Sequence, residues 1–156
     1  MGACCSTIGH NNWSNKSYVL EEVRKNGYSL QHASEELKND PEVVLVAVKE
    51  NGCALQHASK SVRNNKEVII SAFKQNGVAL QYASKELKND PEIVLKAVKQ
   101  DGLLLQYASE SVRNNKEVVM TALKKYAWAL EYASEKLKND PEVILEAEKR
   151  AGKLRK

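Results

Sequence analysis

The sequence predicts an all-α protein, a short α-solenoid of about five 25-residue helix-pair repeats with a leading half-repeat. A five-residue phrase, Leu-Gln-His-Ala-Ser in its first copy, recurs with small changes every 25 residues. It opens at Leu30, Leu55, Leu80, Leu105 and Leu130. A glycine series keeps step at Gly27, Gly52, Gly77, Gly102 and Gly152, interrupted only by Ala127. A fixed period of this length is typical of stacked units that share one core.

Each repeat carries a strong start signal for a long helix, as at Asp40-Pro41-Glu42. Aspartate accepts bonds from the free first-turn amides, proline fits the first helical position, and glutamate favours the positive helix end. Apolar residues at helical spacing follow from 43 to 48, and we expect Gly52 to end the helix in a left-handed cap. The period predicts long helices near 17–26, 41–51, 66–76, 91–101, 116–126 and 141–151.

A shorter second helix is predicted after each glycine. In the repeat that follows Gly52, Leu55, Ala58 and Val62 would share one face, and the helix would end before Asn64. The small alanine and serine columns, which begin at Ala33 and Ser34, would let helices approach closely. We interpret the serines as backbone-bonded or packed rather than as nucleophiles.

A longer period of 50 residues lies on top of the first. The segment 36–42 recurs at 86–92 and nearly at 136–142, whereas 61–67 recurs at 111–117. The array therefore resembles a duplicated pair of repeats. We predict a non-repeat tail over 1–14, a helical repeat domain over 15–152 and a basic tail over 153–156.

Composition indicates a protein of the cytoplasm. Charged residues make up 28% of the chain, and no apolar run approaches the roughly 20 residues that a membrane span needs. The start has no basic segment followed by an apolar one, so we expect no secretory leader. Three cysteines cannot pair completely, which favours a reducing compartment. Because cations and acids alternate and the net charge is only +4, we expect no nucleic-acid partner.

The first six residues fit an acylation signal. Gly2 with Ser6 matches the N-myristoylation pattern, and two thiols follow the glycine. One myristoyl chain binds a membrane only marginally, so palmitoylated cysteines would supply the second anchor. We predict lipidation at Gly2, Cys4 and Cys5, and a location at the cytoplasmic face of a membrane. The alternative is a disordered start with chance residues.

A polar and aromatic ladder precedes the alanine column by one and two positions. Its members are Gln31, His32, Gln56, His57, Gln81, Tyr82, Gln106, Tyr107 and Tyr132, with Glu131 in the last glutamine position. The ladder could line a binding groove or could pack between repeats with ring edges in water. His32 and His57 alone make a poor metal site, because no cysteine or carboxylate column accompanies them. We predict no metal, no cofactor and no catalytic residue.

Two cationic columns accompany the ladder. One contains Lys38, Arg63, Lys88, Arg113 and Lys138, and the other contains Lys49, Lys74, Lys99, Lys124 and Lys149. Both could face phosphates or acidic headgroups. Because both lie near helix C-termini, where the helix dipole favours cations, we interpret them as solvated faces.

The segment from Gly77 to Lys99 resembles a repeat of the domain of unknown function 4116 family, and the resemblance extends over about residues 17–152. It implies helical repeats and no particular chemistry. We therefore expect a non-enzymatic protein-binding or scaffold module, tethered by N-terminal acylation, whose protein partner the sequence does not name. The alternatives are a self-associating structural repeat protein and an effector-like enzyme.

Overall fold

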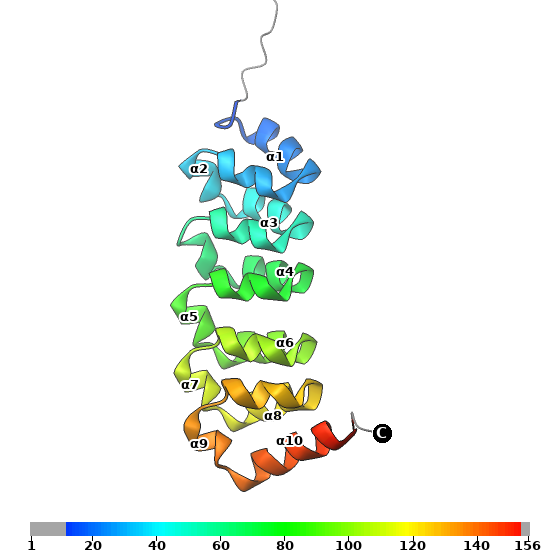
Figure 1. The fold of residues 1–156 in the computed structure, drawn as a ribbon. Helices are drawn as coiled ribbons and strands as arrows, with labels where there is room; N and C mark the ends of the chain where they lie inside the picture. Colours follow the sequence, from blue (N-terminus) through cyan, green and yellow to red (C-terminus); the bar gives the residue numbers. More distant parts are fainter. Residues whose placement is uncertain (1–11, 154–156) are drawn as a thin grey trace, which may run out of the picture.

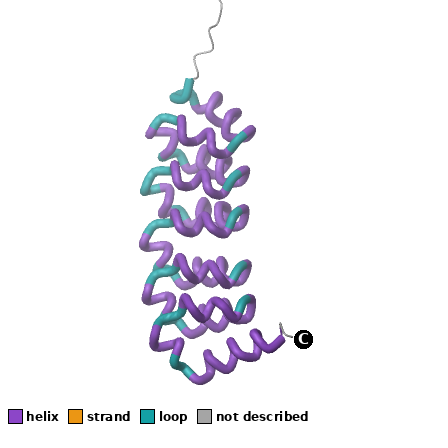
Figure 2. Tube along the Cα trace, viewed as in Figure 1, coloured by secondary structure: helices purple, strands orange, loops and turns teal. Residues whose placement is uncertain are grey.

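The computed structural model describes residues 12–153, which form a column of stacked helices (Figure 1). No strand occurs in this part of the chain, and short loops join the helices (Figure 2). The all-α solenoid is thus confirmed. Its long helices are α1 (Lys16–Lys25), α3 (Pro41–Glu50), α4 (Lys66–Gln75), α6 (Pro91–Gln100), α8 (Lys116–Lys125) and α10 (Pro141–Lys153).

The long helices begin where the predicted caps lie. The Asp40 carboxylate accepts a hydrogen bond from the Glu42 amide at 2.9 Å, and the Asn65 side chain accepts one from the Glu67 amide at the same distance. Helix α3 then buries its apolar face completely, including Val43 and Val44. The predicted long helices are confirmed to within about two residues at each end.

The segment between consecutive long helices, predicted as one shorter helix, is divided in two. A six-residue 3₁₀ helix comes first, as η1 (Gly27–His32), η2 (Gly52–His57), η4 (Gly77–Tyr82), η5 (Gly102–Tyr107) and η6 (Ala127–Tyr132). A short helix follows, as α2 (Glu35–Lys38), η3 (Val62–Asn64), α5 (Lys85–Lys88), α7 (Glu110–Arg113) and α9 (Glu135–Lys138). We number the repeats from first to fifth, each starting at its 3₁₀ helix and ending with the next long helix.

The serine column causes this break in the second helix. Ser84 has an extended backbone and caps α5 by accepting from the Leu87 amide at 3.1 Å. Its hydroxyl donates to Asn64 Oδ1 at 2.6 Å, and its amide donates to the Arg63 carbonyl at 2.9 Å. Ser59, Ser109 and Ser134 make the corresponding bonds to the repeat before them. The serines are therefore bonded to the backbone, as predicted, and they also act as clasps that link neighbouring repeats, which was not predicted.

The left-handed glycine cap was a wrong prediction. No residue in the described part of the chain has a positive φ, and the helix before Gly52 ends at Asn51 in extended backbone. The glycines instead permit close approach to the next long helix. A Cβ added at Gly52 would lie 2.3 Å from the Ala72 carbonyl oxygen, closer than real Cβ atoms come.

Two junctions between long helices depart from this arrangement. At the junction of α4 with α6, a Cβ added at Gly77 would meet Leu104 Cδ1 at 2.9 Å instead of a carbonyl. Leu104 occupies a column that elsewhere holds serine or alanine, and its buried side chain fills the space. At the last junction Ala127 replaces glycine, and α10 turns away from the direction of the other long helices (Figure 1). We call these the open junctions and the other three the close junctions.

Ion pairs account for part of the 50-residue period. Lys66, at the first position of α4, contacts the capping Asp90 of α6 at 2.7 Å. Lys16 and Asp40 pair in the same way, as do Lys116 and Asp140. The long helices between them begin with Pro41 and Pro91, so the bridges occur at alternate junctions.

Candidate functional site

The ladder lies at the C-terminal ends of the 3₁₀ helices, which stack one on another along the column. Three ladder side chains, Gln31, His32 and Gln106, are exposed. The others, Gln56, His57, Gln81, Tyr82, Tyr107 and Tyr132, are half-buried. The ladder side chains therefore form a polar and aromatic strip along all five repeats.

Ring contacts join part of the ladder to the repeat before it. The rings of Trp13 and His32 have centroids 5.0 Å apart, and those of Tyr28 and His57 are 5.9 Å apart. Burial, followed by the charges of Lys38 and His32, lowers the pKa of His57, which favours the neutral imidazole. The ladder side chains therefore pack between repeats and also leave part of their surface exposed.

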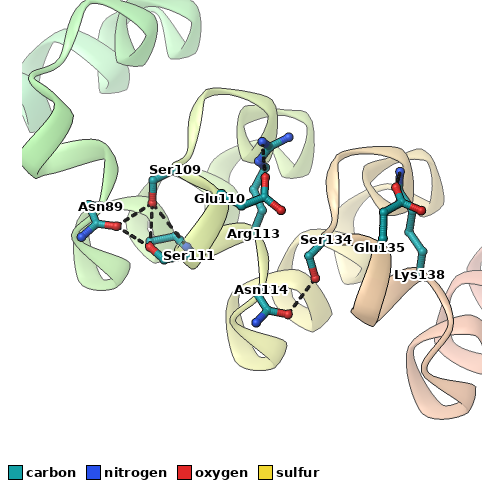
Figure 3. A network of polar contacts seen from close by, with 10 residues as sticks. Asn89, Ser109, Glu110, Ser111, Arg113, Asn114, Ser134, Glu135 and Lys138 are labelled. Carbon is teal, nitrogen blue, oxygen red and sulfur yellow. Dashed lines mark hydrogen bonds and ion pairs between the residues drawn. The ribbon is translucent and has the colours of Figure 1, made fainter.

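The first cationic column is half-buried, and its interpretation as a solvated face was wrong. In three repeats the cation pairs with a glutamate three residues before it. Lys38 contacts Glu35 at 2.9 Å, Arg113 contacts Glu110 at 2.7 Å, and Lys138 contacts Glu135 at 2.7 Å. Figure 3 shows the last two pairs beside the clasps of Ser109 and Ser134. The second column is exposed throughout, as predicted.

The second and third repeats lack this partner. The glutamate position holds Lys60 in one and Lys85 in the other. These lysines, with Arg63 and Lys88, form a group that we call the central cation cluster. The cluster was not predicted from the sequence, although the replacement of glutamate by lysine at 60 and 85 was the signal that could have revealed it.

The central cation cluster borders a hollow of about 640 Å³ between the two repeats. Lys60, Arg63 and Lys85 line it together with Tyr82, Ser84 and Glu86. The Arg63 guanidinium has a buried Nε without a hydrogen-bond partner.

Lys88 is held beside the hollow. Its Nζ donates to the Gln81 carbonyl at 2.5 Å. Burial, and then the charge of Arg63, lowers the pKa of Lys88. The cluster is therefore a place where positive charge is concentrated and incompletely compensated.

The family model for the "Domain of unknown function (DUF4116)" matches three consecutive segments, 15–63, 65–113 and 115–154. The chain belongs to the DUF4116 family. Each matched segment spans about two 25-residue units, in agreement with the 50-residue period. No curated protein and no solved structure matches the chain.

The fifth repeat and the residue before it expose three large apolar side chains. Trp128 is 70% exposed, Leu145 is 50% exposed and Tyr126 is 47% exposed. Between η6 and α10 lies a hollow of about 720 Å³, lined largely by apolar side chains such as Leu130 and Ala151. The hollow occupies the open junction at which Ala127 replaces glycine.

The predicted lipidation residues Gly2, Cys4 and Cys5 lie outside the described residues. Within residues 12–153, no helix is long and apolar enough to cross a membrane. The same residues contain no group of three or more metal-ligating His, Cys, Asp or Glu side chains.

Proposed function

We propose that this DUF4116 chain is a non-enzymatic protein-binding scaffold, held at the cytoplasmic face of a membrane by N-terminal acylation. The observation that carries the proposal is the ladder, because its side chains are exposed or half-buried in every repeat and form one extended surface. Solenoids use such surfaces to bind partners across several units. A ligand would gain many modest contacts from chemically similar positions.

The ladder can be tested with a paired substitution. Tyr82→Ala with Tyr107→Ala removes two half-buried rings, whereas Lys99→Ala with Lys124→Ala changes the exposed column of the same repeats. Proximity labelling in cells, followed by reconstitution with the purified partner, should show binding lost in the ladder variant and retained in the control. Equal binding by both variants would contradict the proposal.

The tether is proposed from the sequence of the first six residues. In a eukaryotic cell, we expect the wild type to sediment with membranes and Gly2→Ala to remain in the supernatant. Cys4→Ser with Cys5→Ser should bind weakly and reversibly, because each buried CH₂ contributes about 0.8 kcal/mol and one chain is marginal. An N-terminus found by intact mass to be unmodified or acetylated would remove the tether and leave a free binding module.

Self-association is a second candidate, favoured by the apolar surface at the fifth repeat. Exposed patches rimmed by polar residues are typical of interaction sites. Sedimentation velocity at rising concentration should then show larger species, and Trp128→Ser should abolish them. A constant sedimentation coefficient for the wild type would exclude this candidate.

A further inference from the structure

The central cation cluster results from a local change in a repeating charge pattern. The first, fourth and fifth repeats each neutralise their half-buried cation with a glutamate at 2.7 to 2.9 Å. In the second and third repeats the same position carries Lys60 and Lys85, which adds positive charge where the other repeats remove it. Three of the four cations, Lys60, Arg63 and Lys85, therefore line one hollow. None of the four forms an ion pair within residues 12–153.

Arg63 is half-buried, whereas the other two cations that line the hollow, Lys60 and Lys85, are exposed. Its Nε is buried and has no hydrogen-bond partner, and an unsatisfied buried donor costs about 1 to 3 kcal/mol. The Arg113 Nε is also buried without a partner, but the Arg113 guanidinium is paired with Glu110. The Arg63 guanidinium has no such carboxylate partner within residues 12–153.

The single acid that lines the hollow, Glu86, compensates the three lining cations only in part. The hydrogen bond from its own backbone amide, followed by the neighbouring Ser84 side chain and the charge of Lys85, lowers the pKa of Glu86. Its carboxylate is thus directed to the N-terminus of α5. Tyr82 adds an aromatic wall, and its half-buried ring is also a member of the ladder.

We propose that the hollow between the second and third repeats binds a phosphorylated side chain of a partner protein, with Arg63, Lys60 and Lys85 as its ligands. A phosphate carries close to two negative charges and three strong acceptor oxygens, which suits a guanidinium flanked by two ammonium groups. A carboxylate would neutralise only one of these charges. This inference rests on the proposed protein-binding function, since it specifies one group that a partner would present.

A phosphorylated protein fits this site better than an anionic membrane. The glutamates of the paired repeats, Glu35, Glu110 and Glu135, have side chains between 74% and 88% exposed along the same column of short helices. A planar anionic surface would meet these carboxylates together with the cluster. A single phosphorylated side chain enters the hollow alone, and screening over about 8 Å at physiological salt weakens the repulsion from the acids beyond it.

The test is a titration of the full chain with free O-phosphoserine, followed by amide chemical shifts. We expect saturable shifts confined to residues 60–64 and 82–88, with Kd on the order of 1 mM for so small a ligand. Lys60→Glu with Lys85→Glu introduces the glutamate that the other repeats already carry, and should weaken binding at least about tenfold. The matched control, Lys74→Glu with Lys99→Glu, makes the same charge change at exposed positions of the same two repeats and should bind like the wild type.

Several results would overturn the inference. Shifts spread over all lysines, an equal loss in the control variant, or equal affinity for glutamate would each show that no phosphate site exists. Binding of unacylated chain to vesicles of phosphatidylcholine and phosphatidylserine, lost with the Lys60 and Lys85 substitutions, would assign the cluster to a membrane instead. Because the probe is a free amino acid, phosphoserine binding would survive a failure of the N-terminal tether, and its absence would leave the ladder proposal standing.

Discussion

The close and open junctions are formed by copies of the same 25-residue repeat, yet their long helices pack differently. At Gly52 the chain lies so near the Ala72 carbonyl that no Cβ fits, whereas at Gly77 the neighbour is the movable end of Leu104. The buried core continues across the junction of α4 with α6 and divides along α6 itself, where Ile93 belongs to the cluster that contains α4 and Val94 belongs to the next. One residue in a repeated column is therefore enough to change how two repeats meet.

The largest expected effect comes from adding a methyl group at a close junction. Gly52→Ala places Cβ 2.3 Å from a backbone oxygen, so α4 must move, and we expect a loss of about 3 kcal/mol. Gly77→Ala is the matched control at an open junction. It meets only a side-chain terminus at 2.9 Å and should cost about 1 kcal/mol. Equal denaturant midpoints for the two variants would contradict the distinction.

A substitution at Leu104 tests what holds the first open junction apart. Leu104→Ala should cost about 2 kcal/mol, at the low end for such truncations, because a small residue at this position allows the other junctions to close. A crystal structure of the variant should show α6 nearer to α4. An unfilled cavity with unmoved helices, together with a loss of about 5 kcal/mol, would show that Leu104 is not a spacer.

The last junction also lacks a helix cap. The 3₁₀ helices that open the first four repeats are capped by an asparagine or aspartate side chain, such as Asp101, which accepts from the Leu103 amide at 2.9 Å. Tyr126 occupies this position before η6 and makes no such bond. Tyr126→Asn should therefore stabilise the chain by about 1 kcal/mol, measured by chemical denaturation. Asp101→Asn, which retains a capping side chain, should change stability little.

The ion pairs at alternate junctions predict a small dependence on pH. The bond from Lys66 is the main cause that lowers the pKa of Asp90 from its ordinary 3.8. The resulting stability is fully present above that value and is lost as pH falls below it. Asp90→Asn keeps a capping side chain but cannot titrate, so its stability should fall less than that of the wild type in acid, by less than about 1 kcal/mol. Parallel denaturation midpoints for both proteins below pH 4 would contradict the assignment.

The smallest effect is expected where glycine has no neighbour. A Cβ added at Gly152 meets no atom within 4 Å, and the residue lies in the last turn of α10. Gly152→Ala should raise the thermal midpoint slightly, by the equivalent of about 0.5 kcal/mol, because alanine favours the helix. A loss of stability would show that α10 packs more closely at its end than the structure indicates.

Much of the fold could be predicted because capping chemistry is local. Asp40 and Pro41 identify a long helix without any knowledge of its neighbours. The division of the segment between long helices into two short helices was harder to predict. Leu55, Ala58 and Val62 suit one helical face whether or not the helix is interrupted between them. A serine before two acids, as in Ser34-Glu35-Glu36, was the available signal for a new helix start.

The candidate site depended on comparison between repeats. The ladder and both cationic columns are visible in the sequence, but burial of the Lys38 column follows from how short helices stack, which no local pattern records. The central cation cluster required a further step, the observation that Lys60 and Lys85 replace glutamate. The glycines allow two segments 20 residues apart to approach closely, and only the structure gives that distance.

The alternating Lys and Asp bridges also bear on how such a chain could grow. A duplication of 50 residues would add one lysine-bearing helix and one aspartate-capped helix. The two types of helix would still alternate, so the Lys–Asp bridges at alternate junctions would continue. A duplication of 25 residues would place two helices of the same type side by side, with either two lysines or two aspartates and no bridge between them. The segment that can be copied without mismatch is therefore a pair of 25-residue repeats. Under selection, the chain would lengthen by two repeats at a time.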